Sequence, residues 1–346
     1  MNALRWGILP ASSHFRLRVL QPLSLASNAR IVAVASREAS KAAVAAGLMD
    51  AVIAEGKPGG ENASPHVRAH ASYDELLSDP EVDAVYISLP NDLHLEWTLK
   101  ALAAGKHVLC EKPFGLDAGQ ARKAADAGRD AGKLVMEAFM YRFHPQWRRA
   151  KEIVMSGEIG RISSMDVSFA YNNRDSDNIR NRPENGGGAL YDIGCYATSC
   201  ARWIMDAEPA RVVCVSERDP DFGTDRLTSG ILDFGGARAT FTVGTQTSSF
   251  QSVTILGDKG SIFIRLPFNA YSDVPMRIDV RSGIGERSVA CGPDDQYRLM
   301  FEAFSGAVLA GRNVPPTPMS DAIANMKVID ALFYSVASGG WSSVVL

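Results

Sequence analysis

The sequence predicts an α/β fold in two parts, a parallel sheet covered by helices followed by a mostly antiparallel sheet. In the N-terminal part, short apolar runs alternate with helical patterns, as in strand–helix–strand units. After Trp147, apolar and polar residues alternate with a period of two, which is typical of half-buried strands. The length of 346 residues allows two domains. We place them at residues 1–143 and 144–346, with the last helix expected to pack back toward the first domain.

The first domain has a regular alternation of predicted elements. The predicted strands are Leu4–Leu9, Ile31–Ala35, Ala84–Leu89, His107–Cys110 and Leu134–Glu137. The predicted helices are Leu17–Ala26, Glu96–Ala104 and Ala118–Ala131. Gly105 and Gly132 follow the last two helices, where a C-capping glycine is expected. The segment 47–71 is rich in Gly, Pro and Ala, and we interpret it partly as an exposed insertion.

The second domain begins with alternation of Met165, Val167, Phe169 and Tyr171 with polar residues. Further strands are predicted at Val212–Ser216, Thr228–Phe234, Ala237–Val243, Ser252–Leu256, Ser261–Arg265 and Met276–Val280. Gly235 and Gly236 are suited to a two-residue hairpin turn. Strands spaced so closely indicate an antiparallel sheet with one covered and one free face, and the free face could be a subunit interface. Two helices end the chain, Gln296–Ala310 and Ser320–Ser338, the latter with Ser320 as N-cap.

The composition is that of an ordinary soluble globular protein, with 46% apolar and 22% charged residues. The net charge of −3 gives no reason to expect nucleic acid or an anionic membrane as a partner. There is neither a signal-peptide pattern nor an apolar run of membrane-spanning length. Five scattered cysteines favour a reducing cytoplasm over a disulfide framework, and the absence of a Cys-x-x-Cys pair gives a zinc site little support.

The first strand leads into a turn that departs from the dinucleotide-binding pattern. That pattern places glycines at positions 10 and 12 and a small residue at 15, whereas this chain has Pro10, Ser12 and Phe15. Ser12 and Ser13 can still offer donors to a pyrophosphate at the helix N-terminus. An ordinary strand-to-helix turn is the alternative.

The second strand ends in Ser36 and Arg37, with Lys41 one turn later. An arginine here accommodates a 2′-phosphate, whereas an acidic residue would bind a free ribose hydroxyl. We therefore predict NADP in preference to NAD, with Ser36 and Arg37 as cofactor ligands. A solvated helix start is the alternative.

Two further strands end in polar residues at the edge where ligands bind to parallel sheets. Asn91 and His94 follow one strand, although Asn91 or Asp92 can instead cap the next helix. Glu111 and Lys112 follow the next strand and are predicted cofactor ligands. A lysine there can bind a substrate hydroxyl and a cofactor ribose, and its charge lowers the pKa of a nearby phenol. Glu111 can alternatively form a surface salt bridge.

A glycine-rich segment, Gly186–Tyr196, contains the remaining candidate residues. Its three glycines allow a sharp turn and a close approach to a ligand. Asp192 and Tyr196 are four positions apart, so a helix would place them on one face. Together with Lys112, they would suit proton transfer to or from an alcohol. The alternative is a glycine hinge followed by a first-turn aspartate and a packed tyrosine.

These motifs, in this order, resemble the Gfo/Idh/MocA oxidoreductases, a family named for glucose–fructose oxidoreductase and inositol dehydrogenase. The resemblance covers nearly the whole chain. It is carried by the segments 5–9, 34–37, 73–77, 90–94, 111–114, 136–145, 178–180 and 186–196.

The resemblance implies a Rossmann domain followed by an α/β domain with a large open, mostly antiparallel sheet. It implies hydride transfer between NADP or NAD and a carbinol or carbonyl carbon of a sugar derivative, without a metal. Lys112, Asp192 and Tyr196 match the catalytic positions, and Tyr141 and Arg180 are weaker candidates for substrate contact. A homo-oligomer, dimer or tetramer, would form through the open sheet. Some relatives are sensors, so a catalytically weak or inactive sugar- or nucleotide-binding protein is the alternative function.

Overall fold

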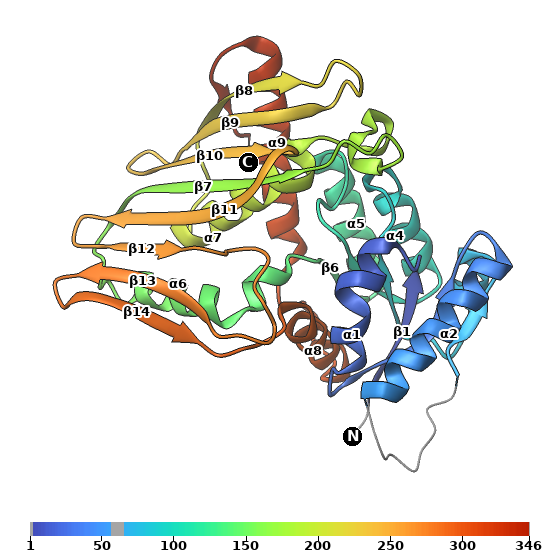
Figure 1. Cartoon of the computed structure of the whole chain (residues 1–346). Coiled ribbons are helices and arrows are strands. Elements are labelled where there is room, and N and C mark those ends of the chain that lie inside the picture. The colour runs from blue at the N-terminus through green and yellow to red at the C-terminus, as the bar shows by residue number, and fades with distance from the viewer. Residues whose placement is uncertain (1–2, 57–65, 346) are drawn as a thin grey trace. The chain divides into compact units, whose positions relative to one another are not determined.

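The computed structural model describes residues 3–56 and 66–345, and internal contacts divide the chain into two units. The first unit comprises Met1–Gly115, Gly119–Met140 and Tyr297–Asp321, and the second comprises Leu116–Ala118, Tyr141–Gln296 and Ala322–Leu346. Each unit contains one sheet (Figure 1).

The first unit contains the predicted parallel sheet. Its six strands run in the order β3-β2-β1-β4-β5-β6, and every neighbouring pair is parallel. The strands are β1 (Leu4–Leu9), β2 (Ala29–Ala35), β3 (Arg68–His70), β4 (Ala84–Ile87), β5 (His107–Cys110) and β6 (Val135–Glu137). The order reverses on the two sides of β1, as in a Rossmann sheet, where ligands bind at the carboxyl ends of the strands.

Helices connect these strands. They are the π-helical η1 (Phe15–Val19), α1 (Leu20–Ser24), α2 (Ala39–Gly56), α3 (Tyr73–Ser78), α4 (His94–Ala103) and α5 (Ala118–Asp130). The helix α8 (Gln296–Leu309), from much later in the chain, lies almost entirely in the same unit. Gly105 and Gly132 adopt φ values of +74° and +62° just after α4 and α5, as predicted. The interpretation of 47–71 as an insertion is wrong at both ends, where α2 and β3 lie; residues 57–65 are outside the described part. The alanine-rich sequence of α2 lacks the polar stripe that usually reveals a helix.

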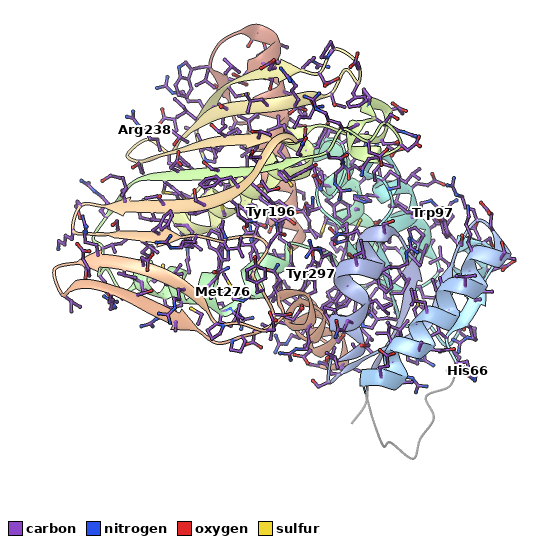
Figure 2. The ribbon with its side chains drawn as sticks, viewed as in Figure 1. His66, Trp97, Tyr196, Arg238, Met276 and Tyr297 are labelled. Carbon is purple, nitrogen blue, oxygen red and sulfur yellow. The ribbon has the colours of Figure 1, made fainter. Side chains whose placement is uncertain are left out.

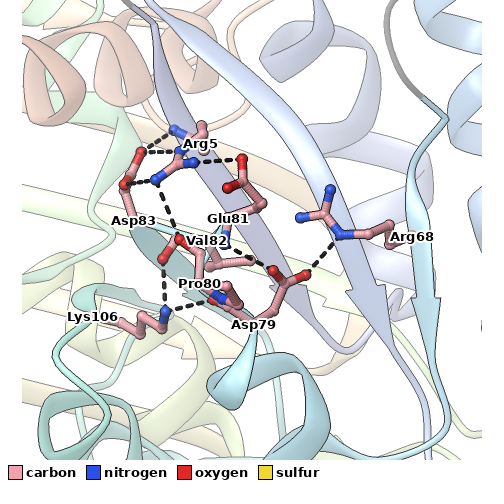
Figure 3. Close-up of polar contacts among 8 residues, drawn as sticks. All are labelled: Arg5, Arg68, Asp79, Pro80, Glu81, Val82, Asp83 and Lys106. Atoms are coloured by element: carbon pink, nitrogen blue, oxygen red, sulfur yellow. Dashed lines mark hydrogen bonds and ion pairs between the residues drawn. The ribbon is translucent and has the colours of Figure 1, made fainter.

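The amino-terminal edge of this sheet is fixed by ion pairs (Figure 3). Arg5 contacts Asp83 and Glu81, each at 2.7 Å, and thereby links β1 to the start of β4. Lys106, just before β5, donates to the carbonyl oxygen of Asp79 at 2.7 Å. Although burial raises the pKa of Asp83, the hydrogen bonds from Arg5 outweigh it and lower that pKa. The candidate cofactor residues lie after the carboxyl ends of the strands, at the opposite edge.

The second unit contains a nine-stranded sheet in the order β14-β13-β12-β11-β7-β10-β9-β8-β15. The strands are β7 (Ile162–Asn172), β8 (Arg211–Arg218), β9 (Asp225–Asp233), β10 (Arg238–Gly244), β11 (Gln246–Gly257), β12 (Ser261–Ile264), β13 (Met276–Ser282), β14 (Gly285–Cys291) and β15 (Ser342–Ser343). Only β10 and β7 pair in parallel, so the predicted mostly antiparallel sheet is confirmed. The Gly235–Gly236 turn is also confirmed, because the Phe234 N–H donates to the Ala237 carbonyl at 2.9 Å.

The two faces of this sheet differ in burial. One row of paired residues is entirely buried: Val212, Leu232, Ala239, Met165, Ile255, Ile262 and Val280. The adjacent row, here called the open-face row, is partly exposed: Val213, Ile231, Thr240, Asp166, Thr254 and Phe263. The helices α6 (Pro145–Met155), α7 (Cys195–Met205) and α9 (Met319–Ser338) lie on the buried side (Figure 1). Because α9 begins at Met319, Ser320 lies inside the first turn and is not its N-cap.

Candidate functional site

The turn after β1 uses the Ser12 hydroxyl to fix its own conformation. Ser12 Oγ accepts the Phe15 N–H at 3.1 Å and lies 3.0 Å from Ser88 Oγ. Ser88 Oγ donates to the Pro10 carbonyl at 3.1 Å, so the Ser12 hydroxyl donates to Ser88. The side chain of Ser12 therefore shapes the turn, and both its donor and its acceptor are engaged within the protein.

Backbone donors remain at the start of the first helix. The first helical hydrogen bond runs from the Arg16 N–H to the Ser12 carbonyl at 3.0 Å. The N–H groups of Ser13 and His14 precede that bond, and such groups need an acceptor from outside the helix. A phosphate is a suitable acceptor. The side chain of Ser13 is exposed and accepts a long 3.4 Å hydrogen bond from Arg16.

Glu111 is a buried anion rather than a surface ion pair. The residue is 8% exposed, and Oε1 accepts the Tyr86 hydroxyl at 2.5 Å. His14 Nε2, from the turn after β1, lies 3.5 Å from the same oxygen. Burial raises the pKa of Glu111, but His14, Lys112 and Tyr86 outweigh it and bring the pKa to about 2. Phe15, which stands where the dinucleotide-binding pattern has a small residue, is fully buried with its ring 6.0 Å from that of Tyr86.

Lys112 is half-buried and follows the end of β5. The backbone after it is held by His94, whose two ring nitrogens each lie 2.9 Å from a carbonyl oxygen, of Pro113 and Leu89. His94 is fully buried, and burial lowers its pKa. Its imidazole therefore contacts the backbone that carries Lys112.

Asn91 begins a short 3-10 turn, η2 (Asn91–Leu93), ahead of α4. The N-cap position of α4 is Leu93, so neither Asn91 nor Asp92 occupies it. Asn91 is half-buried at the carboxyl end of β4, the position at which a cofactor ligand was predicted.

The end of β2 presents an exposed arginine. Ser36 Oγ accepts the Glu38 N–H at 3.4 Å, and Lys41 forms an ion pair with Glu38 at 2.6 Å. Arg37 is exposed and lies near the side chain of Tyr73. Burial raises the pKa of Tyr73, and Arg37 partly offsets that increase. Of the two basic residues Arg37 and Lys41, Lys41 is therefore neutralised by a neighbouring carboxylate, whereas Arg37 lies near a phenol.

In the second unit, the glycines of the Gly186–Tyr196 segment pack against protein. A Cβ atom on Gly187 would lie 2.5 Å from the Arg180 carbonyl oxygen, and one on Gly188 would lie 2.0 Å from Asp225 Oδ1. Gly188 also has φ +114°, a conformation that favours glycine. The predicted reason for these glycines, close approach to a ligand, is therefore corrected: they allow close approach to the protein's own backbone and to a buried carboxylate.

Asp192 lies in a π-helical turn, η6 (Leu190–Gly194), that continues into α7. We call this continuous segment the active-site helix. Asp192 Oδ2 accepts the Tyr171 hydroxyl at 2.6 Å, and Oδ1 lies 3.1 Å from Arg180 Nε. Burial raises the pKa of Tyr171, and the Asp192 charge raises it further. The carboxylate is thus held between a neutral phenol and a guanidinium.

Tyr196, labelled in Figure 2, belongs to the active-site helix, and its ring lies in a cluster of aromatic rings. It is 5% exposed, and its ring lies 5.9 Å from Tyr141, 5.7 Å from Phe169 and 5.1 Å from Phe268. Tyr141 is fully buried, with its hydroxyl 2.8 Å from Ser199 Oγ. Tyr141, predicted as a weaker candidate for substrate contact, is therefore buried within the same aromatic cluster as Tyr196.

Three residues that contact the candidate site were not predicted from the sequence. Tyr171 binds Asp192, Asp225 packs on Gly188, and Glu137 accepts the Phe114 N–H at 2.8 Å beside the Lys112 segment. Tyr171 was read only as part of an alternating strand. A carboxylate ending the apolar run of β6 was the one available signal for Glu137.

Across residues 3–56 and 66–345, no group of three or more His, Cys, Asp or Glu side chains is arranged to hold a metal ion. The helices in this same part of the chain are all too short or too polar to cross a membrane.

Comparison with known proteins adds independent information. Residues 5–139 match the model of an oxidoreductase family with an NAD-binding Rossmann fold, and residues 147–263 match the GFO/IDH/MocA C-terminal domain. An uncharacterised oxidoreductase of Rhizobium meliloti is 39% identical over 350 residues, covering 99% of this chain and 100% of the relative. A D-xylose 1-dehydrogenase (NADP(+)) of Haloferax volcanii is 33% identical over 338 residues, covering 97% and 98%.

A solved structure is also similar over almost the whole length. A 3-ketoreductase from Actinomadura kijaniata, in complex with NADP and TDP-benzene, has a TM-score of 0.85 and 28% identity, covering 96% of this chain and 98% of the other. Further structures of that ketoreductase carry a replaced lysine or a replaced tyrosine, and these two positions are 84 residues apart.

Proposed function

The chain belongs to the GFO/IDH/MocA family of NAD(P)-dependent oxidoreductases, and from that premise we propose that it transfers a hydride between NADP and a carbinol or carbonyl carbon of a sugar or sugar derivative. The observation that supports the proposal is that each unit carries candidate catalytic residues in ordered positions. Lys112 follows β5 in the Rossmann sheet, and Asp192 and Tyr196 lie on the active-site helix.

The first unit fits a dinucleotide in spite of its altered turn. The N–H groups of Ser13 and His14 precede the first helical hydrogen bond and suit a pyrophosphate. The exposed Arg37 suits the 2′-phosphate of NADP. Ser36, Asn91 and Glu111 complete the proposed ligands, and His94 contributes by holding the backbone after Lys112. When bound, NADP supplies the carbon that donates or accepts the hydride.

We assign proton transfer to Tyr196, as general acid or base at the substrate oxygen. Lys112 lowers the pKa of the Tyr196 phenol and orients the reacting hydroxyl. Asp192, held by Tyr171 and Arg180, binds a neighbouring hydroxyl. The separation of Lys112 and Tyr196, 84 positions (196 minus 112), equals that of the lysine and tyrosine altered in the similar ketoreductase, which supports this assignment.

Fluorescence titration with NADPH and NADH tests the proposal against the alternative of a sensor without catalysis. The feature that favours the alternative is the altered turn, whose Ser12 hydroxyl is engaged within the protein. We expect saturable binding of NADPH, tighter than that of NADH. No binding of either at millimolar concentration would favour the sensor.

Replacing Arg37 by alanine should weaken NADPH binding selectively. Loss of a charge-assisted hydrogen bond to the 2′-phosphate costs about 1.5–3 kcal/mol, or roughly ten- to a hundredfold in Kd. NADH has no such phosphate, so its Kd should stay the same. Lys41→Ala is the matched control, because Lys41 is paired with Glu38. Equal losses for both cofactors in Arg37→Ala would contradict the role assigned to Arg37.

We also propose a homo-oligomer formed through the open face of the nine-stranded sheet. The open-face row has β-branched or aromatic residues at five of its six positions, and its one charge, Asp166, accepts the Thr240 hydroxyl at 2.7 Å. Val215, on the same face, is 72% exposed. A surface of this kind, rich in β-branched and aromatic residues and with its one charge already hydrogen-bonded, suits a second copy of the sheet.

A charge in the middle of the open face should dissociate the oligomer. We expect light scattering to give a dimer or tetramer for the wild type and a smaller species for Ile231→Glu, because burying an unpaired carboxylate is costly. Leu17→Glu is the control, since Leu17 is 81% exposed but lies in the first unit. A monomeric wild type, or an unchanged mass for Ile231→Glu, would overturn the proposed interface.

A further inference from the structure

A buried carboxylate lies next to the active-site helix without having a part in the proposed reaction. Asp225, the first residue of β9, is 7% exposed. Its Oδ2 atom accepts the Leu190 N–H at 2.7 Å and the Thr228 hydroxyl at 2.9 Å. Leu190 opens the π-helical turn that carries Asp192. Asp225 thus joins a distant strand to the start of the active-site helix.

The Leu190 N–H is one of the amide groups that a helix leaves without an internal partner. Ala189 occupies the N-cap position and has no side chain that could accept it. A capping side chain usually comes from the N-cap residue itself, whereas here it comes from β9. The negative charge also lies at the positive end of the helix, where it is favourable.

The second carboxylate oxygen fixes the glycine turn. A Cβ atom on Gly188 would lie 2.0 Å from Asp225 Oδ1, so the carboxylate packs directly on the Gly188 backbone. The carbonyl of Gly188 in turn accepts the Asp192 N–H at 3.0 Å. One side chain therefore fixes both the turn and the first residues of the helix that follows it.

The sheet itself does not need this carboxylate. The Thr228 hydroxyl has a second partner, Ser216 Oγ at 2.6 Å, and β9 is paired along its length with β8 and β10. Burial raises the pKa of Asp225 to about 6, so the carboxylate is ionised at neutral pH in spite of its burial. A buried charge of this kind is costly, and such groups are concentrated at functional sites.

We propose that Asp225 is a positioning residue for catalysis, which holds the glycine turn and the start of the active-site helix so that Asp192 and Tyr196 are presented in a fixed geometry. The inference rests on the proposed function, in which those two residues act on the substrate. It extends that function to a side chain of the β-sheet that touches neither substrate nor cofactor.

Three variants test the proposal. Asp225→Ala removes the contacts with the Leu190 N–H and with the Gly188 backbone. Asp225→Asn keeps the side-chain volume and one acceptor oxygen. Asp219→Ala is the matched control, because Asp219 is also 7% exposed and accepts two backbone N–H groups, those of Asp221 and Phe222, without touching the glycine turn. Each variant is assayed for kcat, for NADPH affinity by fluorescence and for hydrogen exchange of the amides in residues 186–196.

For Asp225→Ala, we expect kcat to fall roughly a hundredfold, the loss typical of catalytic groups displaced by about 1 Å. NADPH affinity should not change, because the proposed cofactor ligands lie in the first unit. Hydrogen exchange of the backbone amides in residues 186–196 should be faster than in the wild type, because the turn is no longer held. Asp225→Asn should recover most of kcat, and Asp219→Ala should match the wild type in all three measurements.

Unaltered kcat and exchange in Asp225→Ala would overturn the inference. If Asp225→Ala does not fold, Thr228→Val, which removes only one donor to the carboxylate, should show the same pattern to a smaller degree, and its absence would overturn the inference equally. A wild-type protein without any turnover would instead contradict the proposed function. The exchange measurement would then still decide whether Asp225 fixes the turn.

Discussion

Replacing Tyr196 by phenylalanine lowers kcat by about two or more orders of magnitude if this phenol transfers the proton, since a general acid or base contributes roughly 10²- to 10⁴-fold. The substitution removes only the hydroxyl. The ring contacts with Tyr141, Phe169 and Phe268 remain, so the fold should be retained. NADPH affinity should also be unchanged. The measurement is steady-state kinetics combined with a fluorescence titration of the same preparation.

Tyr191→Phe is the matched control for that result. Tyr191 lies five positions earlier in the active-site helix, and its hydroxyl donates to the Leu116 carbonyl at 2.7 Å. Losing this hydrogen bond should cost about 1 kcal/mol of unfolding free energy and leave kcat unaltered. Near-unchanged kinetics in Tyr196→Phe, or equal losses in both variants, would remove Tyr196 from the mechanism.

Replacing Lys112 by methionine should lower kcat roughly a hundredfold or more and change its pH dependence. A nearby cation favours the ionised phenol, so its removal raises the pKa of Tyr196. Oxidation of an alcohol requires the ionised phenol as base. The rising limb of kcat against pH should therefore move to higher pH.

Lys112→Arg separates the charge of this residue from its shape. It keeps the cation, so the pH profile should stay near that of the wild type, while kcat falls because the larger guanidinium orients the hydroxyl poorly. If the dependence of kcat on pH is the same in Lys112→Met as in the wild type, the role assigned to the lysine charge is contradicted. The contacts that His94 and Glu137 make with the backbone of Pro113 and Phe114, directly after Lys112, should keep the segment folded in both variants.

Much of the fold is readable from the sequence because its signals are local. Apolar runs and capping glycines locate β1 and β5 at their observed bounds, Leu4–Leu9 and His107–Cys110. The missed elements lack such signals. The outer strand β14 (Gly285–Cys291) is largely exposed and has little apolar alternation, and α2 is too uniformly small and apolar to show a helical stripe.

Only part of the candidate site could be predicted from the sequence, for a different reason. Lys112, Asp192 and Tyr196 lie in compact motifs, so spacing and resemblance find them. Their supports come from far along the chain: Asp225 is 35 residues after Leu190, and Glu111 is 97 residues after His14. One sequence carries no record of such contacts. The same distance explains why the glycine turn was attributed to a ligand and not to a carboxylate of β9.

A kinetic survey with the intact protein tests the central claim most directly. Aldoses, inositols and keto-sugars are assayed in both directions with NADP(H) and NAD(H), following the absorbance of the reduced nicotinamide, with Tyr196→Phe as the blank for the chemistry. We expect the wild-type protein to turn over at least one of these compounds, faster with NADP(H) than with NAD(H). Tyr196→Phe should abolish this turnover. Binding of NADPH without oxidation or reduction of any sugar would contradict it.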